Sequence, residues 1–166
     1  MPPIILNMEE SRLEAAFCGD ARPRACVSLP ADIFSATPPL IGKFVSDAIT
    51  KELRADPVEH PIFLLEPPHV SEEVRCKTNG HISQILFETL LVPAIFLAPR
   101  ASLASQKDPW RSINAACQQL GDGEWLTREE FVQYWETTFA SHQAAIVIEQ
   151  IREKLVKMGI LFLTSF

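Results

Sequence analysis

The sequence lacks the features that mark several common classes of protein. It has no run of about 18 apolar residues, so we expect no membrane-spanning helix. The opening MPPIIL lacks the basic flank and the length of a signal peptide. Acidic side chains outnumber basic ones by 21 to 15, and no basic stripe of the kind found in nucleic-acid-binding proteins occurs. We therefore expect neither a membrane span nor a nucleic-acid partner.

The cysteines form no CxxC pair, and no two histidines have the spacing of metal ligands. Their wide spacing also resembles no disulfide framework of a small secreted domain. We therefore expect no zinc site, and reduced, mostly buried thiols in a cytosolic or nuclear protein. The four cysteines are Cys18, Cys26, Cys76 and Cys117.

Glycine is scarce too, with six in the chain and none among residues 1–18. By contrast, 47% of the residues are apolar, which is enough to form a core. The 13 prolines divide the chain into short elements.

Residues 1–106 predict an α/β domain. Stripes of apolar residues at helical spacing predict helices over Ile41–Leu53 and 72–91, and residues 31–40 are expected to form a loop. The order strand, helix, strand at 61–98 predicts a βαβ unit with a parallel pair. The expected strands are Pro3–Leu6, Arg12–Cys18, Ala25–Leu29, Pro61–Leu65 and Ala94–Ala98.

The composition changes after about residue 106, and residues 107–166 predict a helical C-terminal segment. Trp110–Leu120 is expected to form a weak helix. Thr127 and Glu130 form a capping box for the next helix, and a stronger helix is expected over His142–Met158.

The middle helix of this segment carries an aromatic stripe at i, i+3 and i+4 spacing, and the chain ends in an apolar tail. Such a stripe is typical of a face packed against a neighbouring helix or the α/β unit. The alternative is a docking surface for another protein. The partner-binding candidates are Phe131, Tyr134, Trp135, Phe139, Phe162 and Phe166.

Three blocks resemble the actin and actin-related protein family. Residues 15–25, AAFCGDARPRA, are similar to the AGFAGD–PRA signature. Residues 52–68 resemble the segment in which Pro–x–Glu–His–Pro leads into a strand, and residues 83–99 resemble the QIMFE-T…PA helix and strand. Together the blocks cover roughly residues 4–105. The resemblance implies an actin-like, ribonuclease H-like fold, with a mixed sheet and flanking helices.

The first departure from this family pattern concerns phosphate chemistry. Actins follow the first strand with an Asp, a glycine-rich hairpin that cradles the nucleotide phosphates, and a Lys. In this sequence the matching stretch has side chains in place of glycines, and an acid stands where the Lys is expected. Each like charge nearby costs on the order of 1–4 kcal/mol, so we expect no nucleotide cofactor and no catalysis. The degenerate loop comprises Asn7, Glu9, Glu10, Ser11 and Glu14.

The second departure concerns length. After Ser105 nothing matches the family, so neither its second phosphate hairpin nor its larger, base-holding half is represented. Asp122-Gly123 lies in a charged turn and carries little weight as a candidate for that hairpin. A truncated paralogue, a splice product and a fragment of a longer protein all remain open.

Other candidate sites are weaker. His60 and His69 flank a strand and do not readily converge with an acid and a nucleophile, so we expect His60 to pack or cap beside the strand. Glu66 ends that strand, where structural hydrogen bonds are the expected role. The acids at 9, 10 and 14 lack a rigid loop and are typical of a solvated turn rather than a metal site.

The sequence therefore predicts a non-catalytic, cytoplasmic and cytoskeleton-associated scaffold subunit that acts through protein contacts in a multiprotein complex. Within the family, the short connection before Ile41 and the run 96–99 are most similar to actin-related subunits at the pointed end of dynactin. That similarity implies dynactin components or an actin-related filament as partners. The alternatives are a nuclear chromatin-remodelling actin-related subunit, a nucleotide-binding actin-like ATPase and a standalone helical adaptor.

Overall fold

The protein is known from a computed structural model, which describes all residues except 32, 34–37, 67–71, 101–107, 134–136 and 138–166. Its contacts divide the chain into two compact units, Met1–Phe131 and Val132–Phe166. The predicted helix His142–Met158 and the apolar tail lie outside the described residues. In the part of the chain that is described, no helix has both the length and the apolar character needed to cross a bilayer.

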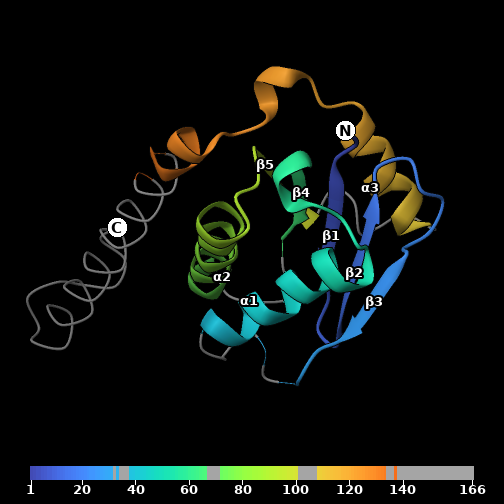
Figure 1. Ribbon diagram of the computed structural model, residues 1–166, viewed down its shortest axis with the longest axis horizontal. Coiled ribbons are helices and arrows are strands. Elements are labelled where there is room, and N and C mark those ends of the chain that lie inside the picture. Colours follow the sequence, from blue (N-terminus) through green and yellow to red (C-terminus); the bar gives the residue numbers. More distant parts are fainter. Residues whose placement is uncertain (32, 34–37, 67–71, 101–107, 134–136, 138–166) are drawn as a thin grey trace, which may run out of the picture. The chain divides into compact units, whose positions relative to one another are not determined.

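A five-stranded mixed sheet forms the centre of the first unit (Figure 1). The strand order is β3-β2-β1-β4-β5; the first three strands pair antiparallel, whereas β1, β4 and β5 run parallel. This confirms the predicted α/β class and its parallel pair. The strands are β1 (Ile4–Met8), β2 (Arg12–Phe17), β3 (Ala25–Ser28), β4 (Ile62–Leu65) and β5 (Ile95–Ala98).

The two central strands are short runs that are buried at every position. Continuous apolar runs are typical of strands that are covered on both faces, and this is why β1 and β4 occupy the middle of the sheet. In β2 exposed or half-buried positions alternate with buried ones over its first half. The polar residues of β1 and β2 come together near the hairpin that joins them.

Two helical crossovers cover one face of the sheet (Figure 1). The first consists of α1 (Pro38–Asp47) and the π-helical turn η2 (Ala48–Glu52). The second consists of α2 (Glu72–Gln84) and the π-helical turn η4 (Ile85–Thr89). The helix α1 thus begins three residues before the predicted start at Ile41, inside the predicted loop, because proline is well tolerated in the first turn of a helix.

Both crossover helices end in the same backbone arrangement. The N–H of Ala55 donates to the carbonyl of Ile49, and the N–H of Val92 donates to the carbonyl of Leu86, each at 3.0 Å. The residues just before these donors adopt left-handed conformations, with φ of 54° at Arg54 and 59° at Leu91. Glycine usually occupies this position after a helix, because a Cβ atom is unfavourable there.

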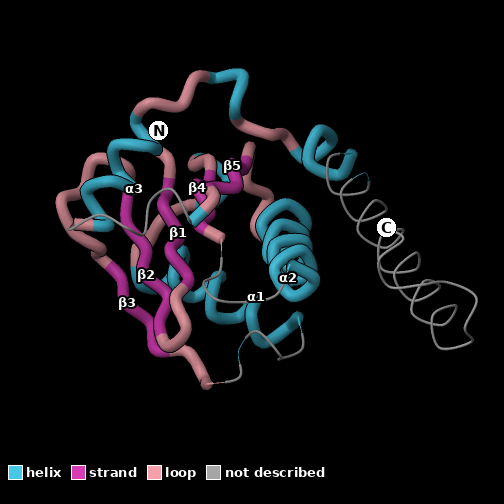
Figure 2. The backbone as a smooth tube through the Cα atoms, turned by 180° about the vertical axis from the view of Figure 1, so that it is seen from behind, coloured by secondary structure: helices cyan, strands magenta, loops and turns pink. Residues whose placement is uncertain are grey.

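A third helix, α3 (Pro109–Gln118), packs on the opposite face of the sheet (Figures 1 and 2). Its buried residues Trp110, Ile113 and Cys117 join one cluster with strand residues of the same face. The strand residues of this cluster are Ile5, Ala16, Phe63, Leu65 and Ala98.

The sequence predicts Trp110–Leu120 as part of a C-terminal segment separate from the α/β domain. The packing of α3 instead makes it part of the sheet-containing unit, which runs past residue 106 to Phe131. Beyond α3, Leu126 pairs with Ile95 through two backbone hydrogen bonds of 2.8 Å.

Candidate functional site

The hairpin between β1 and β2 occupies the position of the predicted degenerate phosphate loop. The N–H of Glu9 donates to the carbonyl of Arg12 at 2.8 Å and closes a tight turn. Glu10 and Ser11 form the tip of this turn, and both are exposed. Asn7 and Glu14 lie opposite each other in the ladder that follows the turn. The Glu9 N–H is therefore occupied by a hydrogen bond within the hairpin.

Arg100 lies where three parallel strands end. It follows β5 by two residues and reaches the ends of both neighbouring strands. Its Nη2 donates to Asn7 Oδ1 at 2.7 Å and to the carbonyl of Met8 at 2.9 Å, while its Nε donates to the carbonyl of Glu66 at 2.8 Å. The carboxyl ends of parallel strands meet at one edge of a sheet, where α/β proteins commonly bind ligands.

Asn7 connects this guanidinium to the acids of the hairpin. Its side chain is almost fully buried, and its Nδ2 donates to Glu9 Oε1 and to Glu14 Oε1, each at 3.3 Å. Arg12 completes the set, because its Nε lies 2.9 Å from Glu9 Oε2 and 3.4 Å from Glu14 Oε1. We call Asn7, Glu9, Arg12, Glu14 and Arg100 the Asn7 cluster.

Burial and mutual charge shift the protonation equilibria of this cluster. Burial raises the pKa of Glu14 above its ordinary value; Arg12 opposes the shift and Glu9 adds to it. Burial also lowers the pKa of Arg100, against the opposing influence of Glu9 and Glu14. A guanidinium nevertheless stays charged in proteins. The two acids and two guanidiniums therefore compensate one another within the cluster.

This arrangement is suited to holding strands together rather than to binding an anion. A phosphate placed at the hairpin would meet Glu9 and Glu14, and it would compete with protein oxygen atoms for the N–H groups of Arg100. Among the described residues, no group of three or more His, Cys, Asp or Glu side chains is arranged to hold a metal ion. The cluster thus has the character of an internal structural network.

Sequence reasoning found the acids of the cluster but missed Arg100. That reasoning treated the family's Lys as lost without replacement, whereas the structure brings a guanidinium to the hairpin from a residue 93 positions away. A signal was present in the sequence, because Arg100 lies two residues beyond the predicted strand Ala94–Ala98, which belongs to the predicted parallel pair. Residues at the ends of parallel strands share one edge of the sheet.

His60 packs beside the sheet, as expected. It is buried, its Nδ1 lies 2.7 Å from the carbonyl oxygen of Pro2, and its ring centroid lies 5.2 Å from that of Phe17. The backbone carbonyl of Glu66 accepts a hydrogen bond from Arg100 Nε. Both residues thus contribute to the packing and bonding of the strands.

Of the predicted partner-binding aromatics, only Phe131 is described. It is buried, and its ring centroid lies 5.7 Å from that of Phe87 in η4, so it packs within the first unit. One of the two bonds of the predicted capping box is present, because Thr127 Oγ1 accepts from the Glu130 N–H at 3.4 Å; the same hydroxyl donates to Glu130 Oε1 at 3.0 Å. The other candidates, Tyr134, Trp135, Phe139, Phe162 and Phe166, lie outside the described residues.

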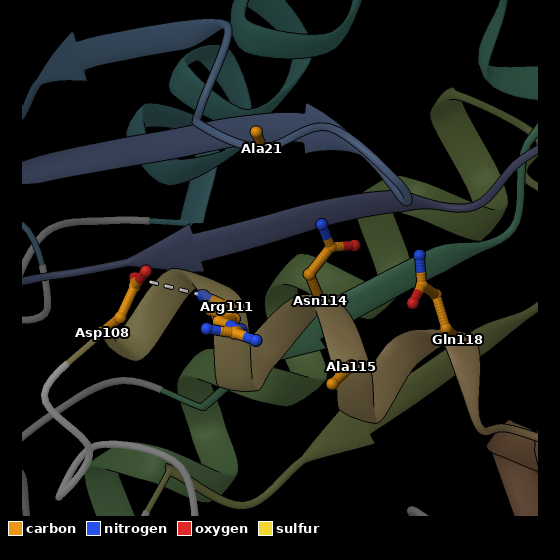
Figure 3. A pocket seen from close by; sticks show the side chains of 6 residues that line it. All are labelled: Ala21, Asp108, Arg111, Asn114, Ala115 and Gln118. Atoms are coloured by element: carbon orange, nitrogen blue, oxygen red, sulfur yellow. Dashed lines mark hydrogen bonds between the residues drawn. The ribbon is translucent and has the colours of Figure 1, made fainter.

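A hollow of about 410 Å³ lies along α3. Figure 3 shows Asn114 and Gln118 projecting from this helix on the side of Ala21, while Asp108 caps the helix by accepting from the Arg111 N–H at 3.2 Å. Among the described residues of its lining, Arg111 and Asp108 carry the charged side chains. The lining residues are Ala21, Asp108, Arg111, Asn114, Ala115 and Gln118.

Comparison with known proteins supports the resemblance on which the site was predicted. No family model matches the chain. The chain is 33% identical over 90 residues to actin-related protein 3 of Drosophila melanogaster. The matched region is 51% of this chain but only 21% of that protein, so the chain spans about a fifth of the length of this relative. The mixed five-stranded sheet with helices on both faces is compatible with an actin-like fold.

Proposed function

We propose that this chain is a non-catalytic actin-related scaffold subunit that acts by protein–protein contacts in a multiprotein complex. The observation that carries the proposal is the Asn7 cluster at the β1–β2 hairpin. There, Arg100 is bonded to Asn7 and to backbone carbonyls, and two acids lie beside it. An actin-like hairpin that holds phosphate would instead present free N–H groups and no opposing carboxylates.

A second candidate function, nucleotide binding by an actin-like ATPase, has one observation in its favour. Arg100 supplies a guanidinium at the carboxyl edge of the parallel strands, and arginine is well suited to binding phosphate. Against it, Arg100 already donates to three protein oxygen atoms, and the carboxyl groups of Glu9 and Glu14 lie in the same cluster. The scaffold role therefore has the stronger support.

Thermal unfolding with and without magnesium-ATP distinguishes the two functions. A ligand at a hundredfold its dissociation constant stabilises the folded state by about 2.7 kcal/mol. We expect no shift in the unfolding temperature of the natural chain at millimolar magnesium-ATP. A clear upward shift would contradict the scaffold role.

The double variant Glu9→Gln, Glu14→Gln is the matched comparison, because it removes both opposing charges while keeping the size of the side chains. A shift that appears only in this variant would identify the acids as the barrier to phosphate. The same measurement with magnesium-AMP controls for effects that do not depend on the polyphosphate.

Within the scaffold class we propose the pointed end of dynactin as the site of action, in the cytoplasm. The similarity of the run 96–99 to that subunit type supports it, and the aromatic residues Trp135 and Phe139 are the proposed contacts. Co-sedimentation of the full chain with the actin-related filament of dynactin tests this assignment. We expect the natural chain to bind the filament. The affinity should fall at least tenfold in the double variant Trp135→Ala, Phe139→Ala, and should stay unchanged in the control Val132→Ala, at an exposed position. Binding to a nuclear remodelling complex instead would favour the chromatin alternative.

A further inference from the structure

Two cysteines meet between the sheet and α3. Cys18 directly follows β2, and the preceding Phe17 contacts His60 on the other face of the sheet. Side chains alternate along a strand, so Cys18 points to the face that α3 covers. It packs against the cluster that contains Cys117, which is 3% exposed and lies on the buried stripe of α3.

Three hydrogen bonds fix the loop after Cys18 to α3. The N–H of Gly19 donates to Asn114 Oδ1 at 2.8 Å, and Asn114 Nδ2 donates to the carbonyl of Asp20 at 2.7 Å. Trp110 Nε1 donates to the same carbonyl at 3.1 Å. Gly19 makes this turn with a φ of 104°, which glycine adopts without strain.

These contacts hold the two thiols in register. Asn114 lies three residues before Cys117, about one helical turn, and Gly19 is the neighbour of Cys18. The bonded pair Gly19–Asn114 therefore holds the segment that carries Cys18 against the part of α3 that carries Cys117. Cys18 is also near enough to Cys117 to raise the pKa of that thiol. In Figure 3, Asn114 projects from α3 towards the chain segment that carries Ala21.

We propose that Cys18 and Cys117 are a redox modification site, in which a peroxide converts the paired thiols to a disulfide that fastens α3 to the sheet. This goes beyond the proposed scaffold function and does not depend on it. Disulfides are rare in reducing compartments, and those that do form there are usually transient or redox-sensing. Both cysteines are free in the structure.

The step balances with hydrogen peroxide as the two-electron oxidant. The thiolate of Cys18, the more exposed of the two, attacks one peroxide oxygen, which gives a sulfenic acid and releases water after protonation. The sulfur of Cys117 then attacks the sulfenic sulfur, an S–S bond forms, and a second water leaves with the thiol proton. Burial and the neighbouring Cys18 raise the pKa of Cys117, so this thiol acts second.

The disulfide would close a loop of roughly 100 residues, and such a closure raises the unfolding temperature of a domain of this size by about 10 °C. In the test, the folded chain of 166 residues is treated with stoichiometric hydrogen peroxide. Free thiols are then blocked, the protein is digested, and the cross-linked peptides are mapped by mass spectrometry. We expect an intact-mass loss of about 2 Da that dithiothreitol reverses, with a peptide joining Cys18 to Cys117.

Two variants control the assignment. Cys26→Ser removes the exposed cysteine of β3 and should leave the mass loss and the temperature shift unchanged. Cys18→Ser changes the half-buried partner and should abolish both, while circular dichroism checks that it folds. If the natural chain shows no mass loss, or if the peptide joins any other pair, the proposal is overturned. The outcome is independent of the ATP and co-sedimentation experiments.

Discussion

The two faces of the sheet bury their side chains by different means. On the face covered by α1 and α2, the inward positions of the central strands are apolar, as at Ile4, Leu6 and Leu64. On the face covered by α3, the buried Ile5 is apolar, whereas Asn7, two residues further along the same strand, is buried and polar. Burial of apolar groups is favourable without partners, whereas buried polar groups need hydrogen bonds to offset desolvation.

This difference means that the two faces should respond to different perturbations. The α1/α2 face depends on side-chain packing and backbone geometry. The α3 face also depends on the Asn7 cluster, in which burial raises the pKa of Glu14. Substitutions on the two faces can therefore be separated by the dependence of stability on pH.

The largest expected effect in this comparison comes from Arg100→Met. Methionine keeps an apolar stem of similar length but leaves Asn7 Oδ1 and the carbonyls of Met8 and Glu66 without this donor. It also removes the cation that interacts with Glu9 and Glu14. We expect a loss of about 2 kcal/mol in the free energy of unfolding, measured by urea denaturation at pH 7.

Arg128→Met is the matched control for this experiment. Arg128 forms an ion pair with Glu88, but both side chains are about half exposed, at 51% and 47%. Exposed pairs typically contribute under about 1 kcal/mol, so this variant should be much milder. Equal losses from the two variants would show that the Asn7 cluster does not stabilise the fold in the way described.

A smaller effect, with a distinct pH dependence, is expected from Glu14→Gln. The pKa of Glu14 is raised in the folded state, so the folded protein binds its proton more tightly than the unfolded chain does. The resulting stabilisation is fully present below about pH 4.5, the ordinary value, and is lost as the pH rises through the raised pKa. Glutamine stays neutral, so the variant should lose this dependence and should be up to about 1 kcal/mol more stable than the natural chain at pH 8.

Urea denaturation from pH 4 to pH 8 checks this expectation. The unfolding free energies of the two proteins should converge at low pH and diverge as the pH rises. The reverse pattern, with the variant weaker at pH 8, would mean that ionised Glu14 is a net stabilising partner of Arg12. In the double variant Arg100→Met, Glu14→Gln, the loss should be smaller than in Arg100→Met alone, because the unpaired acid has been removed.

The apolar periodicity predicted the first face well. The runs at 4–6, 62–65 and 95–98 are strands in the structure, and the stripe beginning at Ile41 lies in the first crossover. Local spacing suffices there because each crossover helix lies next to the strands it connects. The assignment of α3 to this unit was not predicted, since its three buried residues give no information about which surface they contact.

Prediction of the candidate site failed for a similar reason. The hairpin acids were visible because Glu9 and Glu14 are close in sequence and stand where the family pattern has other residues. Arg100 becomes their neighbour only when β4 and β5 add to the sheet in parallel and bring its position to the end of β1. A contact over 93 residues depends on strand order, which local pattern does not specify.

The smallest effect is expected on the face covered by α1 and α2, from Leu91→Gly. Leu91 is 61% exposed and adopts a φ of 59° after η4, so its side chain contributes little packing while its Cβ strains the backbone. Glycine relieves that strain but gains freedom in the unfolded chain, which leaves a net stabilisation of about 0.5 kcal/mol.

The control Thr89→Gly, at an exposed helical position two residues earlier, should instead destabilise the protein by about 1 kcal/mol. For both substitutions, the change in the free energy of unfolding measured by urea denaturation should be the same from pH 4 to pH 8, because neither residue is ionisable. A pH-dependent effect at Leu91 would show that the two faces are coupled, and it would end the distinction between them.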